Sequence, residues 1–214
     1  MSRIEGMVRK EIVEFGRLLY ERRMVTGTSG NISGRVDGDT MVITASGRCK
    51  GALKEYDLVR MEIADGRVSS GGNPSMETPF HLAFYRNRTE VGGVVHAHPL
   101  FCTLLACSGR SVRTDLTPEG LRYLGEVAFV PYATPGSEEL ARNLERAMRD
   151  HEAFIMENHG AITAGRDVAE AYYRMETLEY LAELQLRGEG LTGFKGLPLE
   201  EAHKVMGMAG RGGR

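Results

Sequence analysis

The sequence predicts an α/β domain in which helices cover both faces of a sheet that is not purely parallel. Segments with helical periodicity alternate with strand-like segments along the 214 residues, which is typical of a sheet packed against helices. Two pairs of strand-like segments are joined by two or three turn residues, too few for the crossover that parallel neighbours need. The length is about 1.4 times a ~150-residue domain. We therefore expect one domain over residues 1–190 and a partly disordered tail over 191–214.

The N-terminal half begins with an amphipathic helix and continues as two hairpins. A helix is predicted over residues 4–23, because apolar side chains recur there every three or four positions between charged ones. Asp37-Gly38-Asp39 and Asp65-Gly66 are turn sequences typical of hairpins. The predicted strands are 31–36, 41–45, 58–63, 67–68 and 91–98, and a helix with Pro79 in its first turn is predicted over 78–88.

The C-terminal half alternates short strands with helices. Asp167 and Glu170 resemble a capping box, and the helix that they open is expected to reach Arg187, with Gly188 at its end. Asn158-His159-Gly160 is predicted to be a tight turn between two strands. The other expected elements are a short buried helix over 100–107, strands over 127–130, 153–157 and 161–163, a helix over 137–149, and a disordered glycine-rich end over 210–214.

Charge and composition exclude several classes of function. The chain has 27 Lys and Arg against 29 Asp and Glu, a net charge of −2, whereas general nucleic-acid binding needs a clustered basic field. A small phosphorylated ligand remains compatible, because a few amides and hydroxyls can hold one. Cys49, Cys102 and Cys107 form no disulfide framework, and no apolar run of about 18 residues occurs. We therefore expect a cytoplasmic protein with neither nucleic acid nor a membrane as a partner.

Three of the six histidines occupy positions that suit a metal site. His96 and His98 are two residues apart at the end of a predicted strand, so both imidazoles point the same way and can converge on one ion. His159 can supply a third nitrogen, and three imidazoles with an open position are typical of catalytic zinc. Glu77 can be a fourth ligand or a general base. The alternative is that the first two are packed strand histidines and His159 is a turn residue. The remaining histidines are interpreted as helix-face, surface or tail residues: His81, His151 and His203.

Glycine-rich loops at the two ends of the first hairpin indicate an anion site. Glycine permits positive φ and close backbone approach, successive amides in such turns bind anions, and serine hydroxyls add donors. The alternative is that these residues have ordinary turn roles. Neither loop matches the Walker A or dinucleotide fingerprint, so nucleotide binding is disfavoured. The candidate residues are Gly30, Asn31, Ser46, Gly47 and Ser75.

Five motifs occur together, in a fixed order, within residues 5–187. They are Thr28-Ser29-Gly30-Asn31-Ile32-Ser33, Ile43-Thr44-Ala45-Ser46-Gly47, Pro74-Ser75-Met76-Glu77, Val95-His96-Ala97-His98 and Glu157-Asn158-His159-Gly160. Together they resemble the class II sugar-phosphate aldolases, the family of L-fuculose-1-phosphate aldolase and L-ribulose-5-phosphate 4-epimerase. The resemblance implies a three-layer α/β/α fold with a mostly antiparallel central sheet. It also implies homotetramers with active sites at subunit interfaces.

The resemblance further implies roles for individual residues. It implies a zinc ion held by His96, His98 and His159, with Glu77 as general base and occasional metal ligand. It implies that substrate phosphate is held around Gly30, Asn31, Ser46, Gly47, Ser75 and Met76. Met76 stands where the family often carries a second serine, so only its backbone amide is available there. At the offset of the family's catalytic tyrosine this chain has Thr117, with Tyr123 further on, so the proton donor to the leaving aldehyde is unassigned.

The expected activity is a zinc-dependent aldolase that reversibly cleaves a ketose 1-phosphate of the L-fuculose 1-phosphate type. The products are dihydroxyacetone phosphate and an aldehyde of the L-lactaldehyde type. Zinc would stabilise the enediolate, and Glu77 would move the proton to and from its carbon. Two other activities of the family stay open, pentulose-phosphate 4-epimerase and methylthioribulose-1-phosphate dehydratase, although the epimerases carry aspartate at the position of Glu77. An adducin-head-like binding module is disfavoured, because that domain has lost the metal ligands.

Overall fold

A computed structural model describes residues 2–209 and has a single eight-stranded sheet at its centre. The strands lie in the order β4-β3-β2-β1-β5-β8-β7-β6, and all neighbours are antiparallel except the parallel pair β6 and β7. The mixed sheet predicted from the hairpins is therefore confirmed, and it is mostly antiparallel. The strands are β1 (Asn31–Arg35), β2 (Thr40–Thr44), β3 (Leu58–Glu62), β4 (Val68–Ser70), β5 (Gly93–Ala97), β6 (Val127–Val130), β7 (Ala153–Met156) and β8 (Gly160–Gly165).

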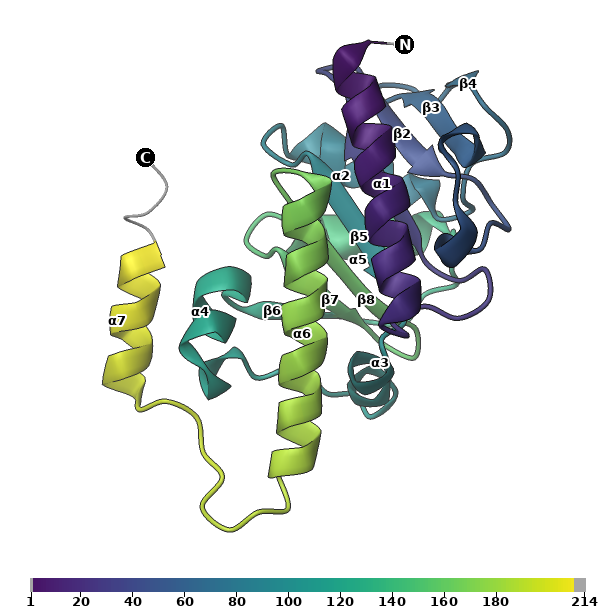
Figure 1. Ribbon diagram of the computed structural model, residues 1–214. Helices are drawn as coiled ribbons and strands as arrows, with labels where there is room; N and C mark the ends of the chain where they lie inside the picture. The colour runs from purple at the N-terminus through teal and green to yellow at the C-terminus, as the bar shows by residue number, and fades with distance from the viewer. Residues whose placement is uncertain (1, 210–214) are drawn as a thin grey trace.

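Helices pack against both faces of the sheet and enclose two apolar cores. Val94 and Val95 are neighbours in β5 but belong to different cores, because successive side chains of a strand face opposite sides. One core is shared with α1, α3 and α6 and the other with α2 and α5. Figure 1 shows α1 and α6 side by side across the near face of the sheet. These helices are α1 (Arg3–Glu21), α2 (Thr78–Asn87), α3 (Leu100–Cys107), α5 (Glu138–Ala147) and α6 (Val168–Gly188).

The structure also contains elements that the sequence pattern did not predict. Thr117 caps the short helix α4 (Pro118–Leu124), and α7 (Leu199–Ala209) lies against α4 within the predicted tail. The expectation that α3 is buried was wrong for one face, because Leu100 and Leu104 are 61% and 47% exposed. The predicted disorder of residues 210–214 lies outside the described residues, and the domain boundaries stay a prediction. Across residues 2–209, no helix combines the length and the apolar character needed to cross a bilayer.

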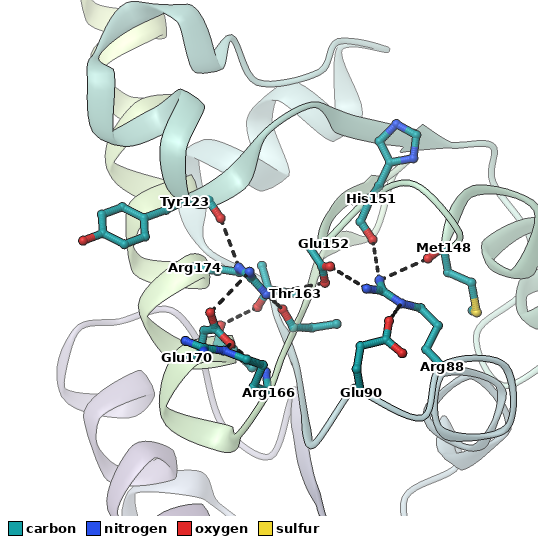
Figure 2. A network of polar contacts seen from close by, with 12 residues as sticks. Arg88, Glu90, Tyr123, Met148, His151, Glu152, Thr163, Arg166, Glu170 and Arg174 are labelled. Atoms are coloured by element: carbon teal, nitrogen blue, oxygen red, sulfur yellow. Dashed lines mark hydrogen bonds and ion pairs between the residues drawn. The ribbon is translucent and has the colours of Figure 1, made fainter. Parts of the chain in front are cut away.

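A polar network ties helices from both faces to one end of the sheet (Figure 2). Glu152, just before β7, accepts a hydrogen bond from Arg88, beyond the end of α2, at 2.5 Å and from Arg174 of α6 at 3.4 Å. Arg174 also donates to the carbonyls of Ala164 in β8 and Tyr123 in α4. Because these bonds join α2, α4 and α6 to β7 and β8, the network restrains the helices relative to the strands on either side of the His159 turn.

Candidate active site

Three neighbouring strands at the centre of the sheet bring the distant motifs together. β5 lies between β1 and β8, with Asn31 of β1 opposite His96. Ala97 of β5 is opposite Ala161 of β8, so the turn before β8 lies beside the end of β5. That turn needs a glycine, because a Cβ added at Gly160 would lie 2.6 Å from a ring carbon of His98. The fold therefore places the two histidine motifs side by side.

The imidazoles of His96, His98 and His159 form one cluster. Their ring centroids are 4.7, 4.8 and 5.2 Å apart, and one ring nitrogen of each lies within 4.8 Å of the others. The Nε2 atoms of His96 and His98 are only 3.0 Å apart. Two neutral imidazoles cannot present lone pairs to each other favourably at that distance unless a proton or a cation lies between them.

Hydrogen bonding and burial leave the imidazoles of the cluster neutral, with ring nitrogens available to a cation. Nδ1 of His96 donates to the Ala161 carbonyl at 2.9 Å, which leaves a lone pair on Nε2. Burial is the main cause that lowers the pKa of His98 to about 3 and that of His159 to about 4, so both are neutral at pH 7. Metals bind the neutral form of imidazole. Oε1 of Glu77 is buried without a hydrogen-bond partner among the described residues. This donor set fits a divalent cation of the zinc type.

Glu77 closes the cluster from the start of α2. Its side chain makes no capping bond to the helix and instead reaches β1, where Oε2 accepts from Nδ2 of Asn31 at 2.8 Å. Oε2 also lies 3.1 Å from Nε2 of His96, and Oε1 lies 3.3 Å from Nε2 of His159. Burial alone would raise the pKa of Glu77, but His96, Asn31 and His159 outweigh it and hold that pKa well below its usual range. The carboxylate is therefore ionised, as a general base must be.

A buried polar chain behind Glu77 was missed by the sequence analysis. His81 was interpreted as a helix-face or surface residue, but it is 0% exposed. Its Nε2 lies 2.5 Å from Oδ1 of Asn31 and its Nδ1 2.6 Å from Oγ of Ser33. Both ends of the Asn31 amide are thus engaged by Glu77 and His81, and the phosphate-binding role of Asn31 stays a prediction. The four-residue spacing from Glu77 to His81, which puts both on one face of a helix, was the available signal.

The two serine-containing loops predicted to hold phosphate lie side by side. Ala45 and Pro74 form an isolated β-bridge, and the amide of Ser46 donates to the carbonyl of Asn73 at 3.0 Å. These backbone contacts join the loop after β2 to the loop before α2. The grouping required for a shared anion site is therefore present, and its use for phosphate stays a prediction.

The other residues predicted to bind phosphate are two glycines in turns, Ser75 and Met76. Gly30 and Gly47 adopt φ values of +74° and +72°, the left-handed region that favours glycine. The hydroxyl of Ser75 accepts from the amide of Glu77 at 3.3 Å, so its hydrogen is free to be donated elsewhere. The side chain of Met76 is 77% exposed and offers no polar group. The glycine turns are thus confirmed as conformations, while the ligand remains to be tested.

Lys50 is a buried cation near these loops that the sequence analysis did not single out. It is 2% exposed, and its ammonium donates to the carbonyls of Thr28 and Arg48 at 2.8 and 2.6 Å. No carboxylate of the described residues forms an ion pair with it. Burial lowers the pKa of Lys50 to about 8, while Cys49 and Glu77 act in the opposite direction. The third ammonium hydrogen is thus available to an anion.

No proton donor for a leaving aldehyde is identified at the positions that the sequence suggested. The hydroxyl oxygen of Thr117 accepts from the amide of Gly120 at 3.1 Å and serves as the cap of α4. Tyr123, further along α4, is exposed, and its backbone carbonyl accepts a hydrogen bond from Nε of Arg174 at 3.0 Å. The hydroxyl of Thr117 therefore has a structural role in α4, and the proton donor stays unassigned.

Comparison with known proteins supports the assignment that this geometry indicates. Residues 10–186 match the family model for the class II aldolase and adducin N-terminal domain. The chain belongs to the class II aldolase family. Its relatives in this family are aldolases and decarboxylases, so the protein is an enzyme of the lyase class. Class II aldolases use a divalent metal, and the three histidines of this member can hold one.

Individual relatives cover nearly the whole chain and carry two activities. The L-fuculose phosphate aldolase of Methanocaldococcus jannaschii is 37% identical over 180 residues, which cover 84% of this class II aldolase and 96% of the relative. The 3-oxo-tetronate 4-phosphate decarboxylase of Escherichia coli K12 is 34% identical over 187 residues, 86% of this chain and 88% of that one. A structure of L-fuculose 1-phosphate aldolase has a TM-score of 0.87 at 30% identity, covering 97% of each chain. YgbL from Escherichia coli has a TM-score of 0.90 at 31% identity, covering 95% of this chain and 100% of its own.

Proposed function

We propose that this protein is a zinc-dependent aldolase that cleaves a ketose 1-phosphate of the L-fuculose 1-phosphate type. The products are dihydroxyacetone phosphate and a short aldehyde of the L-lactaldehyde type. The observation that carries the proposal is the ionised Glu77 carboxylate, which lies 3.1 and 3.3 Å from two nitrogens of the three-histidine cluster. A base next to a cation site is what proton transfer beside a polarised ketone requires.

The residues of the chain divide the chemistry between them. His96, His98 and His159 would hold the cation, which when bound supplies positive charge for a developing oxyanion. Glu77 moves a proton to and from the hydroxyl-bearing carbon next to the ketone. The amides and hydroxyls of the two glycine-rich loops hold the phosphate, with Lys50 as the cation beside them. The candidate phosphate residues remain Gly30, Asn31, Ser46, Gly47, Ser75 and Met76.

A second candidate activity is decarboxylation of a 3-oxo-tetronate 4-phosphate, which one group of relatives performs. Loss of CO₂ from that substrate leaves dihydroxyacetone phosphate, the product that aldol cleavage also releases. In both reactions a carbon–carbon bond next to the ketone breaks, its electron pair forms an enediolate, and a proton then adds to the carbon. The same Glu77 serves both, so the leaving group is what separates the two proposals.

The step that both activities share can be measured without knowing the leaving group. Dihydroxyacetone phosphate is incubated with zinc-loaded protein in D₂O, and exchange of its hydroxymethyl hydrogens is followed by NMR. We expect exchange in the wild type and a fall of about 10²- to 10⁴-fold in Glu77→Gln, the usual contribution of a general base. Wild-type protein that holds zinc and does not exchange these hydrogens would contradict the proposal.

The two candidate substrates are then compared directly. L-Fuculose 1-phosphate and 3-oxo-tetronate 4-phosphate are supplied in parallel, and dihydroxyacetone phosphate is measured in both, with the aldehyde or CO₂ as the second product. Higher kcat/KM on the ketose phosphate supports the aldolase. Higher kcat/KM on the 3-oxo acid selects the decarboxylase instead.

The assembly implied by the family resemblance is part of the same proposal. A homotetramer with interfacial active sites would allow a neighbouring subunit to supply the proton donor, which is unassigned within one chain. Light scattering coupled to size-exclusion chromatography measures the assembly. A monomer with full activity would contradict it.

A further inference from the structure

We propose that a one-way chain of hydrogen bonds, running from Tyr85 through Ser33, His81 and Asn31, positions Glu77 for proton transfer. This inference rests on the proposed role of Glu77 as the base. The hydroxyls of Tyr85 and Ser33 are 2.8 Å apart, and Ser33 is 2.6 Å from Nδ1 of His81. His81 Nε2 is 2.5 Å from Oδ1 of Asn31, whose Nδ2 is 2.8 Å from Oε2 of Glu77. Every member is buried.

The direction of the chain follows from the hydrogen bond that Oε2 of Glu77 accepts from Nδ2 of Asn31. A carboxylate only accepts, so Asn31 donates through Nδ2 and must accept through Oδ1. His81 therefore carries its proton on Nε2, and its Nδ1 accepts from the hydroxyl of Ser33. The single hydroxyl hydrogen of Ser33 is then used, so Tyr85 is the donor to Ser33. Each hydrogen in the chain has one acceptor, and all of them point toward Glu77.

The opposite direction leaves a buried donor without an acceptor. If His81 donated from Nδ1, Ser33 would donate to Tyr85, and no acceptor among the described residues would remain for the Tyr85 hydroxyl hydrogen. A buried unpaired donor costs about 1–3 kcal/mol. That direction would also turn the side-chain oxygen of Asn31 toward Oε2 of Glu77, the oxygen that accepts from Nδ2 of Asn31. The chain therefore has one favourable polarity.

The chain fixes which oxygen of Glu77 is free. Oε2 is held by Asn31, whereas Oε1 has no hydrogen bond in the described part of the molecule. Phe80 stacks on the His81 ring with centroids 4.6 Å apart, which sets the plane in which Nε2 reaches Asn31. Burial lowers the pKa of His81 to about 3, so the ring stays neutral and keeps its single proton. His81 is thus a positioning residue that acts through Asn31 and presents Oε1 to the substrate.

A pair of substitutions at His81 separates positioning from a merely structural role. In His81→Gln the side-chain amide reaches the place of Nε2 and can still donate to Asn31, whereas in His81→Asn it reaches only the place of Nδ1. We expect His81→Asn to lower the rate of hydrogen exchange from dihydroxyacetone phosphate about 10- to 100-fold, with KM and zinc content unchanged. His81→Gln should recover most of the lost rate. Equal rates in the two variants, with equal thermal stability, would overturn the proposal.

The tautomer of His81 provides a test that is independent of activity. Nitrogen-15 NMR of histidine-labelled protein, with His81 assigned from the two variants, distinguishes a proton on Nε2 from one on Nδ1. The expected result is a neutral ring with its proton on Nε2 at pH 7. A proton on Nδ1 would contradict the chain even in an active enzyme. Absence of exchange in the wild type, together with the Nε2 tautomer, would instead contradict only the role of Glu77.

Discussion

At the level of single residues, two buried charged side chains keep part of their hydrogen-bonding capacity unused. Oε1 of Glu77 accepts no hydrogen bond from the described residues, and the Lys50 ammonium is held by two backbone carbonyls without a carboxylate. Buried charges are costly unless an opposite charge or strong hydrogen bonds compensate them. We therefore interpret both as ligand-binding groups, with Glu77 serving the reacting carbon and Lys50 the phosphate.

Replacing Lys50 should weaken binding of the phosphorylated substrate. Lys50→Met removes a hydrogen-bonded charge, an interaction that contributes about 1.5–3 kcal/mol, so KM for dihydroxyacetone phosphate should rise about 10- to 150-fold. The rate at saturation should change much less, because Glu77 and the histidines are untouched. Steady-state exchange kinetics give both constants.

Lys54 provides the matched control for this substitution. It lies four residues further on, and its side chain is exposed, so Lys54→Met removes the same charge without emptying a buried site. Its KM should equal that of the wild type. An unchanged KM in Lys50→Met, or an equal rise in both variants, would show that Lys50 does not contact the phosphate.

Site residues could be predicted from the sequence where their spacing along a strand or turn determines their position. Site residues whose role depends on burial could not. His96 and His98 alternate along a strand and His159 lies in a glycine turn, and the structure brings the three together. His81 and Lys50 resemble ordinary helix and loop residues until packing against β1 and its neighbouring loops buries them. Tertiary contacts of this kind leave no periodic pattern in the chain.

At the level of elements, the site depends on close contact between β5 and the segment that begins α6. Gly93 starts β5, and a Cβ added there would collide with the backbone of Asp167 and Val168. A side chain at this position would push the strand that carries His96 away from α6. Gly93 is not among the glycines with positive φ. The requirement for glycine there therefore comes from the close approach and not from the backbone conformation.

We expect Gly93→Ala to destabilise the fold by about 1–3 kcal/mol, the usual cost of overpacking. Urea unfolding, followed by circular dichroism, gives the free energy of unfolding. Gly38→Ala is the control, because Gly38 has open space around its Cα in the first hairpin turn. If Gly93→Ala and Gly38→Ala had the same free energy of unfolding, β5 and α6 would be able to move apart without loss of stability, which would contradict this prediction.

Strand and helix positions were largely predictable because their patterns are local. α3 and β6 match their predicted ranges residue for residue, and α6 ends at Gly188. The short helix α4 was missed, because seven residues carry too little periodicity to distinguish a helix from a loop. The order of the strands across the sheet depends on contacts between distant segments and was not predicted; the family resemblance implied only that the sheet is mostly antiparallel.

At the level of the whole molecule, burial of neutral histidines links folding to pH. The pKa of His81 is about 3 in the folded chain and has an ordinary value of 6.5. Below pH 6.5 the unfolded chain binds a proton that the folded chain does not, so stability present above that pH is lost as pH falls toward 3. The slope from one such group reaches about 1.4 kcal/mol per pH unit.

The free energy of unfolding of metal-free protein, measured by urea titration from pH 7 to pH 4, tests this linkage. We expect stability to fall with pH in the wild type and to fall less steeply in His81→Gln, which lacks the titrating group. The difference in slope between the two should approach the value for one proton at pH 5. Parallel curves would show that His81 takes up its proton in the folded chain as well.

The central claim is that side chains at the adjoining ends of β5 and β8, with Glu77 at the start of α2, build a single catalytic metal centre. The most direct test is the zinc content of purified protein after equilibration at a fixed free zinc concentration. We predict about one ion per chain in the wild type, near-complete loss in His159→Ala, and full content in the control His151→Ala, whose ring instead bonds the Ala147 carbonyl. Full zinc content in His159→Ala would contradict the account.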